Sequence, residues 1–219
     1  MNLALAGLIV LIIGDSHLAA KDFLLGSLHT ALEAQGANVE SYGVCGSAPH
    51  DWVAQTTLGC GRGERHGMGP AEIEPGKVRT WSLDALIRRH HPNLVIIELG
   101  DNMAGYGVLP DLLRDWIAQQ VNELLLPVEA DHLPCLWVGP AWGSEGGPSK
   151  KTYARVKELS EDLATLVSPP CHYINSLTFS QPGQWPTLDG EHLTPDSYQI
   201  WGNDIAGEVV KYAARLPRH

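Results

Sequence analysis

The sequence predicts an α/β fold in which a parallel β-sheet lies between two layers of helices. Along the 219 residues, short apolar runs typical of strands alternate with amphipathic segments of helical length. The run at residues 94–99 is almost continuously apolar, as expected for a strand covered on both faces. The longest stretches that break the alternation each come directly after an expected strand. They therefore lie at the carboxyl edge of the sheet, where such folds bind ligands.

The strands are predicted at residues 8–13, 38–42, 94–99, 135–139 and 172–175. The helices are predicted at residues 19–35, 78–90, 109–126, 149–166 and 195–215. Thr194 and Pro195 fit the cap and the first turn of the last helix. Loops are expected at about residues 43–78, 140–148 and 176–193, the first of them a long insertion.

The composition indicates a single domain over residues 1–219, with 44% apolar residues available for a core. The formal net charge of −10 argues against nucleic acid as a partner. No apolar run reaches the length of an integral membrane span. We interpret most of residues 1–13 as the first strand, because they lack the basic region and cleavage site of a leader.

The four cysteines, Cys45, Cys60, Cys135 and Cys171, leave two interpretations open. None forms the C-x-x-C pair of a zinc or thioredoxin-type site. They are either buried free thiols of a cytoplasmic protein or two disulfides of a periplasmic or secreted protein. Cys45 and Cys60 bracket one loop, and Cys135 and Cys171 open two strands expected side by side, which favours two disulfides and an extracytoplasmic location.

Ser16 comes directly after the first strand, and two interpretations fit it. It is either the N-cap of the next helix or a nucleophile held at the rim of the sheet beside that helix terminus. Near the end of the chain, Asp189 precedes His192 by three positions. A carboxylate so placed can hold the imidazole in the tautomer that accepts a serine proton, and Glu191 is the competing partner.

Asn102 comes after the third strand in Gly100-Asp101-Asn102. Two interpretations fit these residues: they form a turn, or the Asn102 side-chain amide donates a hydrogen bond to an oxyanion. Gly46, in the loop after the second strand, offers a backbone N–H for the same purpose.

In this order, the blocks resemble those of the SGNH hydrolase family, also called GDSL esterases. The family's signature residues are Ser, Gly, Asn and His in four separate blocks. The similar segments here are Gly14-Asp15-Ser16, Val44-Cys45-Gly46-Ser47 (with Gly43 as a rival glycine), Gly100-Asp101-Asn102 and Asp189-Gly190-Glu191-His192.

The resemblance implies a three-layer α/β/α sandwich with a five-stranded parallel sheet in the flavodoxin-like order 2-1-3-4-5. It implies that Ser16 is the nucleophile, His192 the base and Asp189 the acid. The Ser16 and Gly46 N–H groups and the Asn102 side chain would form the oxyanion hole. No H-E-x-x-H motif is present, and neither a metal nor another cofactor is expected.

Two positions depart from the family pattern. Met103 stands where the G-x-N-D block has an acid, so any hydrogen bonds of that acid must be replaced. His17 makes the serine block G-D-S-H, which is similar to members that handle acetyl groups on bacterial polysaccharides.

The expected function is therefore removal of short acyl groups, acetyl above all, from a carbohydrate or polysaccharide. Asp15, His17, Trp142 and Trp185 are the candidate substrate-binding residues, since indole faces stack on sugar rings. Three alternatives remain open: a polysaccharide O-acetyltransferase with the same triad, a lipase or thioesterase, and an inactive carbohydrate-binding subunit.

Overall fold

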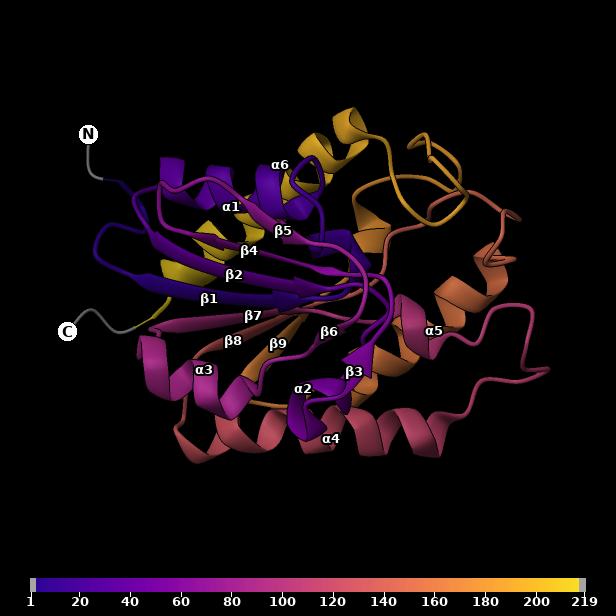
Figure 1. Cartoon of the computed structure of the whole chain (residues 1–219), viewed down its shortest axis with the longest axis horizontal. Helices are drawn as coiled ribbons and strands as arrows, with labels where there is room; N and C mark the ends of the chain where they lie inside the picture. Colours follow the sequence, from indigo (N-terminus) through magenta and orange to yellow (C-terminus); the bar gives the residue numbers. More distant parts are fainter. Residues whose placement is uncertain (1–2, 217–219) are drawn as a thin grey trace.

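The computed structural model, which describes residues 3–216, has a seven-stranded sheet between two layers of helices (Figure 1). The predicted α/β class is confirmed. The strand order is β5-β4-β2-β1-β7-β8-β9. These strands are β1 (Ile9–Gly14), β2 (Asn38–Val44), β4 (Arg62–His66), β5 (Glu72–Glu74), β7 (Leu94–Glu98), β8 (Cys135–Val138) and β9 (Cys171–Ile174). Two short strands, β3 (Thr57–Leu58) and β6 (Val78–Arg79), pair separately.

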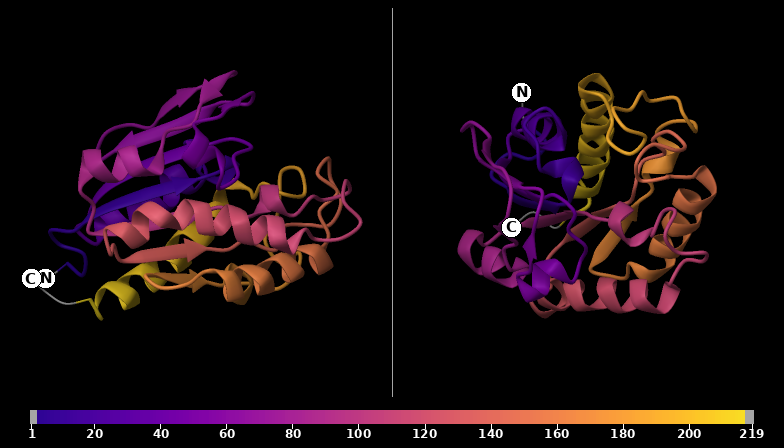
Figure 2. Two further views of the ribbon diagram at one scale, coloured as in Figure 1. Left: turned by 90° about the horizontal axis from the view of Figure 1, so that it is seen from below. Right: turned by 45° about the vertical axis from the view of Figure 1, so that its right-hand side comes forward.

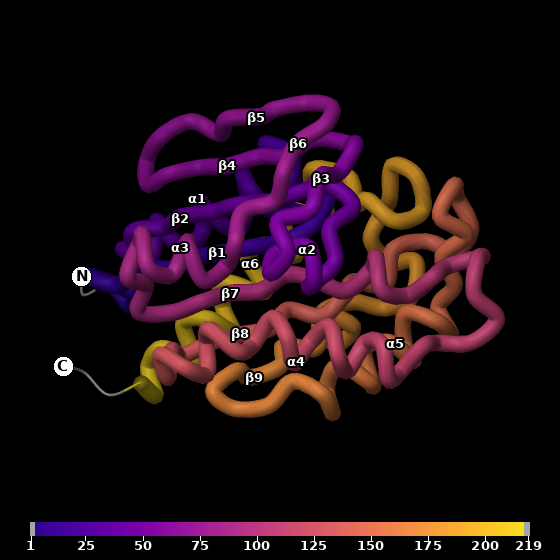
Figure 3. Tube along the Cα trace, turned by 60° about the horizontal axis from the view of Figure 1, so that its bottom comes forward, coloured from indigo at the N-terminus to yellow at the C-terminus, as the bar shows by residue number. Residues whose placement is uncertain are grey.

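The expected sheet of five parallel strands is wrong, because two antiparallel strands extend it. Parallel pairing joins β2, β1, β7, β8 and β9 in that spatial order. Strand β4 then pairs antiparallel with β2, and β5 with β4, along the edge opposite β9 (Figure 3). Both come from the segment expected to be a loop. Their side chains are mostly charged, as is common at a solvated sheet edge, so no apolar run marks them.

The helices cover both faces of the sheet. Helices α1 (Leu24–Ala34) and α6 (Pro195–Ala213) lie side by side on one face (Figure 2). The other face is covered by α3 (Leu83–His90), α4 (Arg114–Ala130), α5 (Tyr153–Leu166) and the short α2 (Asp51–Ala54). Alternate residues of β1 and β7 enter the two cores, which explains why nearly every residue of both strands is apolar.

Helix α4 begins at Arg114, five residues later than predicted. Gly105 and Gly107 lie at positive φ in the irregular segment before this helix. Trp116, in the first turn of this helix, is 40% exposed.

Two disulfides tie the fold together. Cys135 and Cys171 join the first residues of β8 and β9. Cys45 and Cys60 join the end of β2 to the residues just before β4. Within residues 3–216, no helix combines the length and the apolar character that crossing a membrane requires.

Candidate active site

Ser16 lies just past the end of β1 and opens a short 3-10 turn, η1 (Ser16–Leu18). Asp15 caps this turn, because its Oδ1 accepts the N–H of His17 at 3.0 Å. The alternative that Ser16 caps a helix is wrong, since α1 begins only at Leu24. The expected help from a helix N-terminus is absent for the same reason, and the turn alone fixes the serine at the rim.

The structure connects the predicted nucleophile, base and acid by two successive hydrogen bonds. Ser16 Oγ lies 2.8 Å from His192 Nε2, across 176 positions of sequence. His192 Nδ1 lies 2.7 Å from Asp189 Oδ2. An imidazole has two nitrogens, and both are engaged, so Glu191 is not the carboxylate that orients this ring.

Asp189 accepts hydrogen bonds at both carboxylate oxygens. Its Oδ1 accepts the backbone N–H groups of Glu191 at 3.0 Å and His192 at 2.8 Å. Partial burial raises the pKa of Asp189, but these bonds and the one from the imidazole outweigh it and hold the pKa below its usual range. The ionised carboxylate therefore keeps a proton on Nδ1 and leaves Nε2 able to accept the serine proton.

Asn102 lies in the 3-10 turn η2 (Asp101–Met103) that comes after β7. Its Nδ2 donates to the Ser47 carbonyl oxygen at 3.0 Å and to Asp15 Oδ2 at 3.3 Å. The side-chain amide thus connects the three segments that come after β1, β2 and β7.

Gly46 precedes Ser47, whose carbonyl oxygen accepts from this amide. It is exposed, with φ of 79°, in the loop that the Cys45–Cys60 bond closes. The rival glycine, Gly43, is buried inside β2, where a Cβ would lie 2.2 Å from the Leu18 carbonyl oxygen. Gly43 therefore serves packing between β2 and the serine turn.

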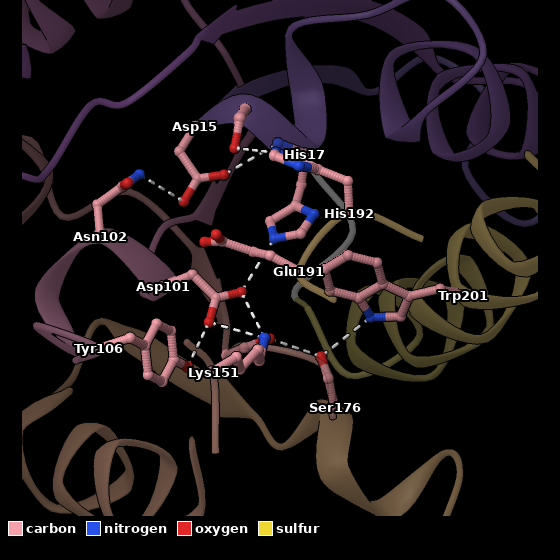
Figure 4. A network of polar contacts seen from close by, with 12 residues as sticks. Asp15, His17, Asp101, Asn102, Tyr106, Lys151, Ser176, Glu191, His192 and Trp201 are labelled. Carbon is pink, nitrogen blue, oxygen red and sulfur yellow. Dashed lines mark hydrogen bonds and ion pairs between the residues drawn. The ribbon is translucent and has the colours of Figure 1, made fainter. Parts of the chain in front are cut away.

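A buried polar network lies beneath these residues (Figure 4). Asp101 Oδ2 accepts from His17 Nε2 at 2.9 Å, and Lys151 Nζ donates to both oxygens of Asp101 at 2.9 Å. The Tyr106 hydroxyl donates to Asp101 Oδ1 at 2.6 Å. Because a carboxylate only accepts, His17 carries its proton on Nε2, and its Nδ1 accepts from the Tyr198 hydroxyl at 2.6 Å.

Sequence reasoning missed Lys151, Tyr106 and Tyr198. Lys151 comes after Ser149 and Lys150 in a polar loop, a pattern typical of solvated side chains. Nothing in that pattern distinguishes the buried lysine from its exposed neighbour.

Three of the four residues predicted to bind substrate are buried, so that prediction is wrong for them. Asp15 is fully buried and His17 is 1% exposed, because both make hydrogen bonds beneath the serine. Trp185 is 5% exposed and packs in the core between the sheet and α6. Trp142 is half-buried, and its indole N–H donates to the carbonyl oxygens of Leu177 and Ser180.

Asp15 and Glu98 add two buried carboxyl groups next to the network. Burial, together with neighbouring acidic groups, raises the pKa of Glu98 well above its usual range. Burial likewise raises the pKa of Asp15 well above its usual range. Glu98 Oε2 has no hydrogen-bond partner among the described residues, which fits a carboxyl group that holds its proton.

Potential ligand atoms of His17, Asp101 and Glu191 lie within 4.8 Å of one another, as do those of Asp15, His17 and Glu98. Both nitrogens of His17 are already hydrogen-bonded, and Lys151 supplies a positive charge to Asp101. The donors thus serve an internal network.

Comparison with known proteins agrees with this architecture. No protein-family profile matches the chain. The arylesterase of M. smegmatis superposes with a TM-score of 0.65 at 17% identity, over 94% of this chain and 99% of that one. Est24, a carbohydrate acetylesterase from Sinorhizobium meliloti, superposes with a TM-score of 0.63 at 19% identity, over 93% and 98% of the two chains. The chain thus shares its fold with esterases, as the resemblance to SGNH hydrolases predicted.

A curated relative is closer in sequence. Protein BcsX of Komagataeibacter xylinus is 40% identical over 220 residues, covering 99% of this chain and 82% of that protein. The chain belongs to the same family as Protein BcsX.

Proposed function

We propose that the protein is a serine esterase that removes short acyl groups, acetyl above all, from carbohydrate through an acyl-enzyme on Ser16. The observation that carries the proposal is a pair of hydrogen bonds that share the His192 ring. Ser16 Oγ lies 2.8 Å from His192 Nε2, and His192 Nδ1 lies 2.7 Å from Asp189 Oδ2. A serine is activated for covalent catalysis when a base lies within hydrogen-bonding reach and a third group orients that base.

In the first half-reaction, His192 Nε2 takes the proton from Ser16 as Oγ forms a bond with the acyl carbonyl carbon. The C=O electron pair moves to the oxygen, giving a tetrahedral oxyanion. His192 then donates its proton to the departing sugar hydroxyl as the C–O bond breaks. In the second half-reaction, water loses a proton to His192 and attacks the carbonyl carbon of the acyl-serine. The bond between this carbon and Oγ then breaks, and His192 returns the proton to Ser16 Oγ. Free Ser16 and acetic acid result, and the acid ionises to acetate.

The oxyanion would lie between the N–H groups of Ser16 and Gly46 and the Asn102 amide. Both N–H groups of Asn102 Nδ2 are engaged, and the contact to Asp15 at 3.3 Å is the longer. The amide would exchange this contact for the oxyanion. A protonated Asp15 is a weaker acceptor than a carboxylate, so the raised pKa of Asp15 favours the exchange.

A short acyl group on a large alcohol fits the open character of the site. The side chains of His192 and Asp189 are 24% and 40% exposed, and Gly46 is exposed as well. The carbohydrate acetylesterase Est24 shares the fold. The two disulfides support a location in an oxidising compartment outside the cytoplasm, and the substrate would be encountered there.

The test is an acetate-release screen over acetylated xylan, cellulose, alginate and peptidoglycan, with Ser16→Ala as the matched control. Release that disappears in Ser16→Ala supports the proposal, with an expected loss of several orders of magnitude in turnover. Faster hydrolysis of p-nitrophenyl octanoate than of the acetate would contradict a short acyl group and favour a lipase or thioesterase. Transfer of acetyl to an added oligosaccharide in preference to water would identify an O-acetyltransferase. A folded wild type that hydrolyses no ester would favour a carbohydrate-binding subunit.

A further inference from the structure

Lys151 is a buried cation that the proposed reaction does not use. Its side chain is 1% exposed, and its ammonium group lies 2.9 Å from each oxygen of Asp101, which is equally buried. A buried ion pair often contributes no more to stability than apolar side chains of the same volume, because both charges lose their hydration. The residues that this pair connects are therefore of more interest than its contribution to stability.

The Asp101 end of the pair holds two parts of the site. Asp101 directly precedes Asn102 in the turn after β7. Its Oδ2 also accepts from the ring of His17 at 2.9 Å, and His17 is the residue next to Ser16 in the turn after β1. One carboxylate thus fixes the proposed nucleophile and the proposed oxyanion donor relative to each other.

Lys151 lies in a loop that contacts the third part of the site, the segment with Asp189 and His192. Backbone hydrogen bonds of 2.8 and 3.1 Å between Gly146 and Lys151 close a loop, and this loop packs on the segment that carries Asp189. Ser144 N–H donates to the Gly190 carbonyl oxygen at 2.8 Å. At Gly147 a Cβ would lie 1.8 Å from the Asp189 carbonyl oxygen, so only glycine allows this approach.

The groups around Asp101 favour the ionised form of its carboxyl group. Burial raises the pKa of Asp101, but Lys151 and the hydrogen bonds from His17 and Tyr106 outweigh it and hold the pKa below its usual range. Lys151 also lies above the Tyr106 ring, 5.6 Å from its centroid. The pair is thus a fixed connection with defined geometry at both ends.

We propose that Lys151 is a positioning residue for catalysis. Its ion pair with Asp101 sets the distance between the segments carrying Ser16 and Asn102 and the loop carrying Asp189 and His192. The inference rests on the proposed function. It also identifies a replacement for the acid that the family pattern expects at Met103, because Asp101, two positions earlier, anchors the neighbouring loops.

The test compares Lys151→Met with Lys150→Met, which changes the exposed neighbour in the same loop. Misplacement of reacting groups by about 1 Å costs on the order of 100-fold in rate. Lys151→Met should therefore lower kcat for p-nitrophenyl acetate about 100-fold, with KM within about threefold of wild type. Lys150→Met should match wild type. Labelling of Ser16 by diethyl p-nitrophenyl phosphate, monitored by mass, should slow in parallel with kcat, because it needs the same alignment.

A double variant, Lys151→Met with Asp101→Asn, controls for the unpaired buried carboxylate that Lys151→Met leaves. Urea unfolding identifies which variants fold. A folded Lys151→Met, or a folded double variant, with kcat and labelling rate within twofold of wild type would show that the pair positions nothing. Wild type that neither turns over esters nor labels at Ser16 would instead refute the proposed function, and the two failures are thereby distinguished.

Discussion

Asp189→Asn offers a sharp test of the catalytic geometry, because the structure dictates how the new side chain must lie. Asp189 Oδ1 accepts two backbone N–H groups, from Glu191 and His192. In the variant, only the amide oxygen can occupy that position, so the amide NH₂ must face His192 Nδ1. Nδ1 then becomes an acceptor, and the ring proton moves to Nε2, which faces Ser16 Oγ and can no longer take its proton.

The cost of this wrong tautomer in serine hydrolases is about 10⁴-fold in kcat. It corresponds to about 5.4 kcal/mol of transition-state stabilisation at 1.36 kcal/mol for each tenfold change. The assay is p-nitrophenyl acetate hydrolysis at neutral pH, with urea unfolding as the check on folding. The matched control is Glu191→Gln, a neighbouring carboxyl group outside the triad, for which less than a tenfold loss is expected. An Asp189→Asn enzyme with more than a tenth of wild-type kcat, or an equal loss in Glu191→Gln, would refute the assigned geometry.

Two further predictions concern the disulfides and a buried acid. With loops of 15 and 36 residues, replacing Cys45 and Cys60 by alanine should cost about 3 kcal/mol of unfolding free energy, and replacing Cys135 and Cys171 about 4 kcal/mol. Only replacement of Cys45 and Cys60 should also lower ester turnover, because their bond closes the loop that contains the proposed oxyanion glycine. Urea unfolding and ester kinetics of the two double variants test both expectations. Equal turnover in the two double variants would contradict the second. Since the pKa of Glu98 is raised in the folded state, its stabilising proton is lost as the pH rises through that value. Glu98→Gln should therefore lose less unfolding free energy than wild type as the pH rises above the ordinary pKa of a glutamate, and an identical pH dependence would contradict a buried proton at this site.

The parts of the fold that sequence predicted are those set by local apolar pattern. The buried strands β1 and β7 are covered on both faces, so nearly every residue is apolar and the pattern is unambiguous. In a parallel sheet, the segments just past the carboxyl ends of the strands lie at one edge. Ser16 and Asn102 could thus be assigned to the same rim without any knowledge of side-chain contacts.

The edge strands β4 and β5 could not be predicted for the opposite reason. Their residues, such as Arg62 and Glu74, face solvent on a sheet edge and form ion pairs there. A charged strand of this kind has the composition of a loop. The pairing of β4 with β2 is determined by the position of β4 in the fold, and it produces no periodic apolar pattern in the sequence.

Three of the four candidate substrate-binding residues were mispredicted because residue type does not indicate burial. Trp185 and His17 both belong to types that bind sugars or transfer protons, yet one fills the core and the other supports the serine turn. The opposite error concerns Lys151, whose type predicts exposure. In each case, tertiary contacts across long sequence separations decide the environment.

These two errors share a physical origin that bears on how the site works. Catalytic side chains must be accessible, and their positions at strand ends result from chain topology. The groups that hold them must be rigid, which requires burial, and burial of charge requires a partner supplied from elsewhere in the chain. Asp101 and Lys151, 50 positions apart, meet this requirement for each other. Their pairing also connects the loops after β7 and β8. We therefore expect the orientation of the triad to depend on Lys151, a residue that lies outside every catalytic motif.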